Sequence, residues 1–193
     1  GTIRKSAGAG TASINLFTSH IGASLDQVSG NLNFTSGADF SGATTVTGPG
    51  LTLSAGTFTF FDGATYTGDL NISGGTTNIE GGLILTNLGL SGGIINVNTL
   101  GISALSGNTL TASSINWTSG ATINGGGTGV LSLGLLDSMT LTGAVGSYTL
   151  DNLTVNNAGT INYATTGNRL TLNSGTQLNN SKLLGIQGDL TVL

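Results

Sequence analysis

The stretch that decides the fold runs from Asp69 to Ser91 and reads DLNISGGTTNIEGGLILTNLGLS. A short apolar segment, Leu70-Asn71-Ile72, is followed by a glycine pair and a second strand-like segment, Thr76-Thr77-Asn78-Ile79. Another glycine pair leads into a third segment, after which the unit begins again. The alternation of apolar and polar residues in these segments is typical of short strands with one buried face.

The same unit recurs along almost the whole chain, marked by a leucine two residues before another apolar residue. The leucines that open these steps are Leu32, Leu51, Leu70, Leu88, Leu110, Leu131, Leu153, Leu170 and Leu190. Successive leucines lie 17 to 22 residues apart, and a fixed period of this length is the sequence signature of a solenoid. The uneven spacings indicate insertions at the corners between strands, where extra residues cost little.

The intervals between these leucines are rich in Gly, Thr, Ser and Asn and poor in helix formers. This composition argues against a leucine-rich repeat, whose units need a segment able to form a helix. The sequence therefore predicts an all-β fold, a parallel β-helix (β-solenoid) of about nine coils of roughly 20 residues. The 34 glycines supply the corners, because glycine tolerates the positive φ that tight turns require.

Composition limits the classes of function. The unbroken repeat predicts a single domain over residues 1–193, with a less regular part at 1–31 and regular repeats at 32–193. A net charge of −4 with only four Lys and Arg residues argues against binding to nucleic acid. The chain has no run of eighteen apolar residues that would predict a membrane span. Because cysteine is absent, disulfides and thiolate metal sites are excluded.

The two ends of the chain are expected to be open edges of the solenoid. Gly1-Thr2-Ile3 matches the phase of Gly159-Thr160-Ile161, and Leu190-Thr191-Val192 contains the last leucine step. This phase predicts that the chain starts and stops within a coil, and neither end offers an amphipathic capping helix. Bare strand edges template association. The predicted interface for end-to-end stacking consists of Gly1, Thr2, Ile3, Leu190, Thr191 and Val192.

The first residues also resemble a known class of proteins. Gly1 to Thr11, GTIRKSAGAGT, is similar to the N-A-G-T-x-x-K-S-x-G-x-G-T signature of very large secreted bacterial proteins with haemagglutinin-like and autotransporter-like β-strand repeats. The stretch from Gly50 to Thr57, GLTLSAGT, also resembles the style of their repeats. The resemblance implies a right-handed parallel β-helix on or outside the cell, used in adhesion or as a stalk or fibre. It implies no catalytic residues.

Charged side chains offer two candidate clusters. Asp151, Arg169 and Asp189 each lie one or two residues before a leucine step, so we expect them on one edge of three successive coils. A polysaccharide lyase or hydrolase would need such a convergence of ionisable groups, but a surface ion-pair ladder is the favoured interpretation. Asp62 and Glu80 are expected to be neighbours across coils, as two solvated acids rather than a calcium site, which would need more oxygen ligands.

The remaining candidates are single residues. We expect His20, the one histidine, to lie in a solvated loop. Trp117 is interpreted as a strand residue, with stacking on a sugar as the alternative. Asn78 and Asn96 both lie eight residues after a leucine step, so they predict a structural ladder of stacked amides. The glycine-rich run Gly125–Gly129 is interpreted as a corner, since it lacks the Lys of a phosphate-binding loop.

These observations lead to one main functional hypothesis and two alternatives. The main hypothesis is a non-enzymatic extracellular structural protein, either a filament subunit or a segment of a long surface adhesin. Its partners would be further copies of itself or neighbouring coils of a longer chain, and no cofactor or metal is expected. The first alternative is a module that binds a glycan or a cell through corner loops, chiefly those of the wide units 88–110 and 131–153. The second is an enzyme that acts on polysaccharides.

Overall fold

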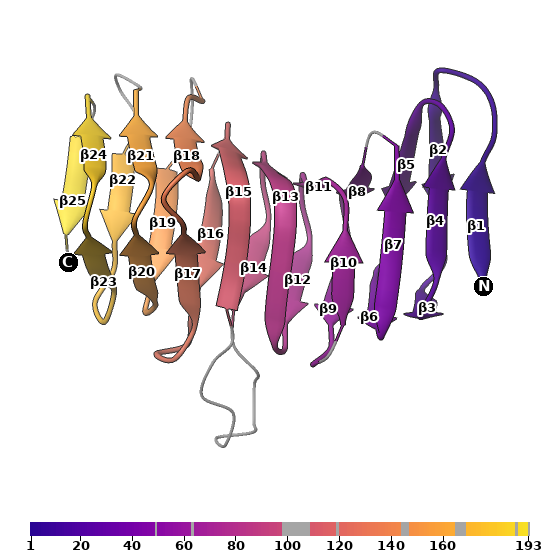
Figure 1. Ribbon diagram of the computed structural model, residues 1–193, viewed down its shortest axis with the longest axis horizontal. Helices are drawn as coiled ribbons and strands as arrows, with labels where there is room; N and C mark the ends of the chain where they lie inside the picture. Colours follow the sequence, from indigo (N-terminus) through magenta and orange to yellow (C-terminus); the bar gives the residue numbers. More distant parts are fainter. Residues whose placement is uncertain are drawn as a thin grey trace.

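The computed structural model describes residues 1–48, 50–62, 64–97, 109–118, 120–143, 147–164, 169–187 and 189–192. These residues form strands, turns and bends, and none of them is helical. The strands pair in parallel and wind into a solenoid with its two ends at opposite sides of the molecule (Figure 1). The predicted all-β parallel β-helix is therefore confirmed.

The turns of the solenoid pass over three faces. The first face begins with β1 (Thr2–Lys5), β4 (Ser24–Gln27), β7 (Ala43–Thr47) and β10 (Thr65–Thr67). The second face begins with β2 (Thr11–Ile14), β5 (Asn31–Phe34), β8 (Leu51–Leu53) and β11 (Leu70–Ile72). The third face is one sheet of β3 (Thr18–Ile21), β6 (Ala38–Ser41), β9 (Thr57–Phe60), β12 (Thr76–Ile79), β14 (Ile94–Asn96), β16 (Ala121–Asn124), β19 (Ser147–Asp151), β22 (Arg169–Leu172) and β25 (Asp189–Val192).

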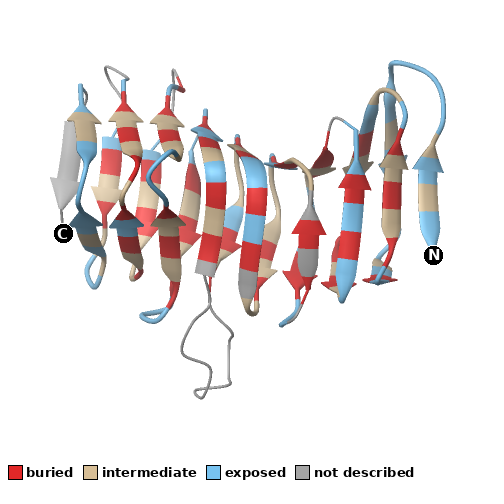
Figure 2. Ribbon diagram, viewed as in Figure 1, coloured by how far each residue is buried: buried red, intermediate tan, exposed pale blue. Residues whose placement is uncertain are grey.

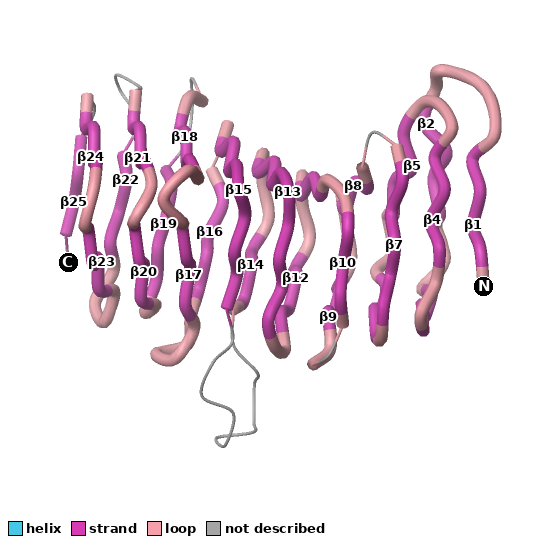
Figure 3. Tube along the Cα trace, viewed as in Figure 1, coloured by secondary structure: helices cyan, strands magenta, loops and turns pink. Residues whose placement is uncertain are grey.

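The first and second faces merge in the middle of the molecule and separate again towards the C-terminal end. The strands β13 (Gly82–Leu90) and β15 (Thr109–Trp117) are long enough to serve both faces. Beyond them the first face continues as β17 (Val130–Leu133), β20 (Thr154–Asn157) and β23 (Gln177–Asn180). The second continues as β18 (Ser138–Leu141), β21 (Thr160–Tyr163) and β24 (Leu183–Ile186). Figure 3 shows the loops that separate these strands as pink segments between magenta ones.

The number of turns differs slightly from the expectation. The solenoid comprises about seven turns. Among the described strands, those of the first turn, β1 to β3, and those of the last, β23 to β25, pair on one side only. The predicted count of about nine coils is therefore slightly too high. The nine leucine steps do not mark nine turns, because Leu153, directly before β20, and Leu170 in β22 belong to the same turn.

The leucine steps stay on one face only in the first half of the chain. Leu32, Leu51, Leu70 and Leu88 stack directly on one another in the second face, as predicted. Further along, Leu110 and Leu131 pair with each other on the first face. Leu170 and Leu190 pair on the third face. The leucine steps therefore do not form a single row along the whole solenoid, because the wider units place the next step on another face.

The core fills the space between the three faces. Buried positions alternate with intermediate or exposed ones along most strands (Figure 2). In β8, Leu51 and Leu53 are fully buried, while Thr52 between them is partly exposed. Inward side chains of successive turns thus form continuous apolar columns, which explains why the turns depend on stacking for their stability.

Gly37 illustrates why a corner of this solenoid requires glycine. Its φ is +98°, and a Cβ atom at this position would overlap the carbonyl oxygen of Thr57 in the next turn. Both conditions exclude a side chain, because L-residues rarely adopt this conformation and the backbone of the next turn cannot withdraw without breaking its pairing.

Candidate functional site

The open ends of the solenoid are the first candidate site. Their strands expose backbone donors and acceptors along one edge each, because they have a paired neighbour on the other side only. Apolar side chains of both terminal turns are packed against the core and remain partly exposed. At the N-terminal end these are Ile3, Ala12 and Ile14, and at the C-terminal end they are Leu178 and Leu184. Each end therefore presents an incomplete layer of the core.

His20 lies in the incomplete layer at the N-terminal end. Its ring stacks on Phe40 of the next turn at a centroid distance of 5.2 Å and an interplanar angle of 15°. Phe40 stacks in turn on Phe60 at 4.6 Å. The expectation of a solvated loop is wrong, because the side chain is 5% exposed and faces the core. An aromatic column over β3, β6 and β9 explains this position.

The electrostatics of His20 follow from this burial. Burial lowers the pKa of the imidazole below its usual value of 6.5, and the positive amino-terminal charge lowers it further. Nε2 lies 2.9 Å from the Thr18 hydroxyl, which can serve as its hydrogen-bond partner. A hollow of about 480 Å³ beside the ring is lined by residues of β1 and β3. A neutral ring at this edge suits contact with further apolar residues.

The residues predicted for end-to-end stacking lie at the two ends, but on different faces. Thr2 and Ile3 belong to β1 on the first face, while Leu190, Thr191 and Val192 belong to β25 on the third. Thr160, whose phase was matched to Thr2, lies in β21 on the second face. The two predicted segments therefore cannot pair with each other. The strand below β1 in a continued solenoid would be β23, and the strand above β25 would be β3.

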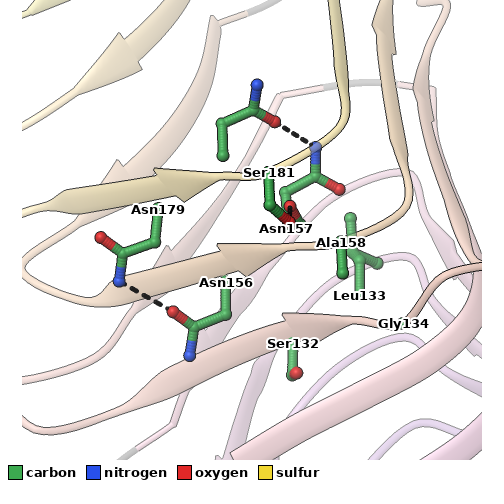
Figure 4. Close-up of a pocket in the computed structure, with 9 residues that line it drawn as sticks. Ser132, Leu133, Gly134, Asn156, Asn157, Ala158, Asn179 and Ser181 are labelled. Atoms are coloured by element: carbon green, nitrogen blue, oxygen red, sulfur yellow. Dashed lines mark hydrogen bonds between the residues drawn. The ribbon is translucent and has the colours of Figure 1, made fainter.

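A groove near the C-terminal end is the second candidate site (Figure 4). It has a volume of about 450 Å³ and follows the bends after β17, β20 and β23. Its lining residues include Ser132, Gly134, Asn156, Asn157, Asn179 and Asn180. The site was missed in the sequence, although the two Asn-Asn pairs at 156–157 and 179–180 were a usable signal.

The asparagines of this groove form two ladders with different environments. In the inner ladder Asn157, 1% exposed, donates from Nδ2 to Asn180 Oδ1 at 2.6 Å and to the Leu183 carbonyl at 3.1 Å. Its Oδ1 accepts a hydrogen bond from the Gly159 amide at 3.0 Å. In the outer ladder Asn179 Nδ2 donates to Asn156 Oδ1 at 2.8 Å, and both residues are exposed.

The predicted charged cluster does not assemble as expected. Arg169 pairs in register with Asp189 of the next turn and with Ser147 of the preceding one. Asp151 is the last residue of β19, whereas Ser147 is its first. Asp151 is thus separated from Arg169 by the length of a strand, and the expectation of one common edge is wrong. The prediction assumed that every leucine step has the same position on a turn. This assumption fails here, because Leu153 and Leu170 lie on different parts of a turn.

An ion-pair ladder does occur, but at the other end of the molecule. Arg4 Nε donates to Asp26 Oδ2 at 2.8 Å, and the Thr47 hydroxyl donates to Asp26 Oδ1 at 2.8 Å. These residues lie in register on β1, β4 and β7 of the first face. The pair is solvent-exposed, so we expect a small contribution to stability. Sequence analysis missed it because the first turns were the least regular part of the repeat.

The other predicted residues have mainly structural roles. Asn96 Nδ2 donates to Asn78 Oδ1 at 2.8 Å, which confirms the predicted amide ladder. Trp117 is fully buried and contacts Tyr148 edge-on at 5.3 Å, so its interpretation as a strand residue is confirmed and stacking on a sugar is excluded. Asp62 lies next to Gly81, one residue after Glu80 in the adjacent turn, so the two acids are neighbours across turns.

Most of the long corner in the wide unit 88–110, residues 98–108, lies outside the described residues. Within the described ranges, no group of three or more His, Asp and Glu side chains comes together to hold a metal ion. The same part of the chain contains no helix that is long and apolar enough to cross a membrane. Comparisons with protein-family models, with curated proteins and with solved structures find no match.

Proposed function

We propose that this chain is a non-enzymatic structural element of an extracellular filament or surface fibre, and that its ends stack on further copies of itself or on neighbouring coils of a longer chain. The observation that carries the proposal is the pair of incomplete core layers at the two ends. Each layer combines unpaired strand edges with half-buried apolar side chains. Stacking of one copy on the next would satisfy both, since backbone groups would pair and the apolar columns would continue.

The order of inward and outward residues is compatible at the two ends. In β2, Ala12 and Ile14 face the core, and in β24, Leu184 does the same. When β2 of one copy is laid on β24 of another with Ala12 over Leu184, all inward positions coincide and Ser13 lies over Gly185. In the same way Ile3 of β1 lies over Leu178 of β23. Such a contact joins unlike surfaces, so it leads to an open fibre and not to a closed dimer.

Three further observations support a structural role outside the cell. The residues that came closest to an enzymatic cluster, Asp151 and Arg169, lie at opposite ends of their strands. The resemblance of Gly1–Thr11 to secreted bacterial repeat proteins supports the extracellular location. Only 6% of residues are charged, and such a surface repels a neighbouring copy weakly.

The stacking geometry can be tested by disulfide trapping, since the chain contains no cysteine. The double variant Ser13→Cys with Gly185→Cys places one thiol at each end. A side chain at Gly185 meets ordinary contacts only, 3.5 Å from Asn162 Oδ1. In-register strands lie about 4.8 Å apart, within the Cα separation that a disulfide bridges. We expect a ladder of covalent oligomers on a non-reducing gel that collapses to monomer on reduction.

A matched control separates stacking from random collision. The variant Ser13→Cys with Asn162→Cys moves the second thiol one turn inward on the same face. Across a stacked junction this doubles the separation to about 9.6 Å, which is too far for a disulfide. Oligomers in the first variant alone would support the proposal. Monomers in both variants, or equal oligomers in both, would mean that a second copy is not the partner of these edges.

A further inference from the structure

The groove along the outer asparagine ladder has features of a binding site that the stacking of copies does not require. We propose that it binds an uncharged, extended glycan chain that lies parallel to the solenoid axis. This proposal is independent of end-to-end stacking, because the groove follows the flank of the first face and not an end of the solenoid.

The polar atoms of the groove are available to a ligand. Ser132, Asn156 and Asn179 stand in register on β17, β20 and β23 and face outward. Asn156 and Asn179 share one hydrogen bond. Among the described residues, the Ser132 hydroxyl, Asn156 Nδ2 and Asn179 Oδ1 have no partner. The row thus offers a hydroxyl, a donor and an acceptor to one ligand, which is the combination that sugar hydroxyls can satisfy.

The inner ladder makes the outer one unnecessary for the fold. The buried Asn157 side chain bonds Asn180 and Leu183 of the next turn and Gly159 of its own turn. Asn156 and Asn179 form one exposed hydrogen bond beside it, which contributes little to stability. An exposed amide row with unused groups along a hollow is typical of recognition surfaces.

The charge and shape of the groove define the class of ligand. Its lining contains no charged residue. The nearby ammonium of Lys182 is bound to the Leu135 carbonyl at 2.8 Å. The lining also includes Gly134 and Ala158, which are at least partly exposed and whose CH groups suit the apolar face of a sugar ring. These features select a neutral ligand over a uronate or a sulfated polymer.

The spacing of the turns explains why the ligand would be a chain. The three outward residues repeat at about 4.8 Å along the axis, which is close to the length of one pyranose unit in an extended β-1,4-linked glycan. Consecutive sugars would therefore lie beside Ser132, Asn156 and Asn179 in turn. A single sugar or a disaccharide would use only part of the row and bind more weakly.

The test is calorimetric titration with cellotetraose, β-1,4-mannotetraose and tetragalacturonate. We expect at least one neutral tetraose to bind saturably, with one tetraose molecule per protein molecule. The corresponding disaccharide should bind more weakly by about tenfold or more. The double variant Asn156→Ala with Asn179→Ala should lower the affinity for the tetraose by about tenfold or more, since it removes two ligand-facing amides. Asn162→Ala, an outward asparagine of the same turn as Asn156, is the control and should bind like the unchanged protein.

Three results would overturn the proposal. These are failure of both neutral tetraoses to saturate the protein, tighter binding of tetragalacturonate than of either, and unchanged binding in the double variant. Urea unfolding of each variant shows that it is folded. A loss of binding in the Asn162→Ala control together with the double variant would indicate a site elsewhere on the flank and would equally reject the groove.

Discussion

Asn157 and Asn156 are adjacent residues of one turn that differ in burial and are expected to contribute unequally to stability. Their separate substitution by alanine tests the distinction between the two ladders. In Asn157→Ala the Gly159 amide loses its acceptor at 3.0 Å while it stays buried. A buried donor without a partner costs about 1–3 kcal/mol, and the small cavity adds about 1 kcal/mol. Asn180 and Leu183 are exposed, so water replaces their lost bonds. The expected loss of unfolding free energy is about 2–4 kcal/mol.

In Asn156→Ala both partners of the lost hydrogen bond are exposed, and the expected change is below about 0.5 kcal/mol. The assay is urea unfolding, followed through the circular dichroism signal of the strands. The dependence of the unfolding free energy on urea concentration should be the same in each variant before the free energies are compared. Equal destabilisation by the two substitutions would refute the reasoning, because it would mean that burial does not distinguish the ladders. A loss near zero for Asn157→Ala would refute it as well.

Two further predictions concern the first turns. Because burial lowers the pKa of His20 in the folded protein, the unfolded chain takes up a proton first as pH falls through 6.5, and the unfolding free energy should decrease below that pH. His20→Phe should flatten this part of the profile, measured by urea unfolding from about pH 8 to about pH 5; an unchanged slope would contradict the assignment. Gly37→Ala should lower the thermal midpoint by several degrees, since the left-handed conformation alone costs about 1–2 kcal/mol. Gly10→Ala, with open space around its Cβ position, should not, and equal shifts would contradict the role of the corner.

The sequence was sufficient to predict the solenoid, because its evidence is repeated in every turn. The period and the alternation of residues both predict stacked parallel strands, and the row from Leu32 to Leu88 has the predicted register. The amide ladder from Asn78 to Asn96 was predicted for the same reason. In this part of the chain, equal spacing in sequence means equal position on the turn.

Position on the turn became unpredictable where the spacing changed. All three faces carry the same pattern of a leucine and a second apolar residue, so a wider unit can place the next step on another face without any local sign. Leu110 and Leu170 therefore lie on the first and third faces. The same ambiguity explains why Asp151 and Arg169 were wrongly predicted to share an edge. His20 was mispredicted for a different reason, since its burial depends on Phe40 in the next turn, a contact that no local pattern reveals.

The two proposed surfaces meet at the last turn, and their geometry limits how they combine. With Ile3 of one copy over Leu178 of another, Arg4 follows Asn179 in the outward row. Arg4 is held by Asp26, so the row changes from neutral amides to an ion pair at the junction. A neutral glycan matched to the amides would therefore stop there, and each copy would retain its own groove of three turns. Stacking would multiply the grooves without lengthening them, so that a fibre would present many weak sites along one flank and bind a long polymer through avidity.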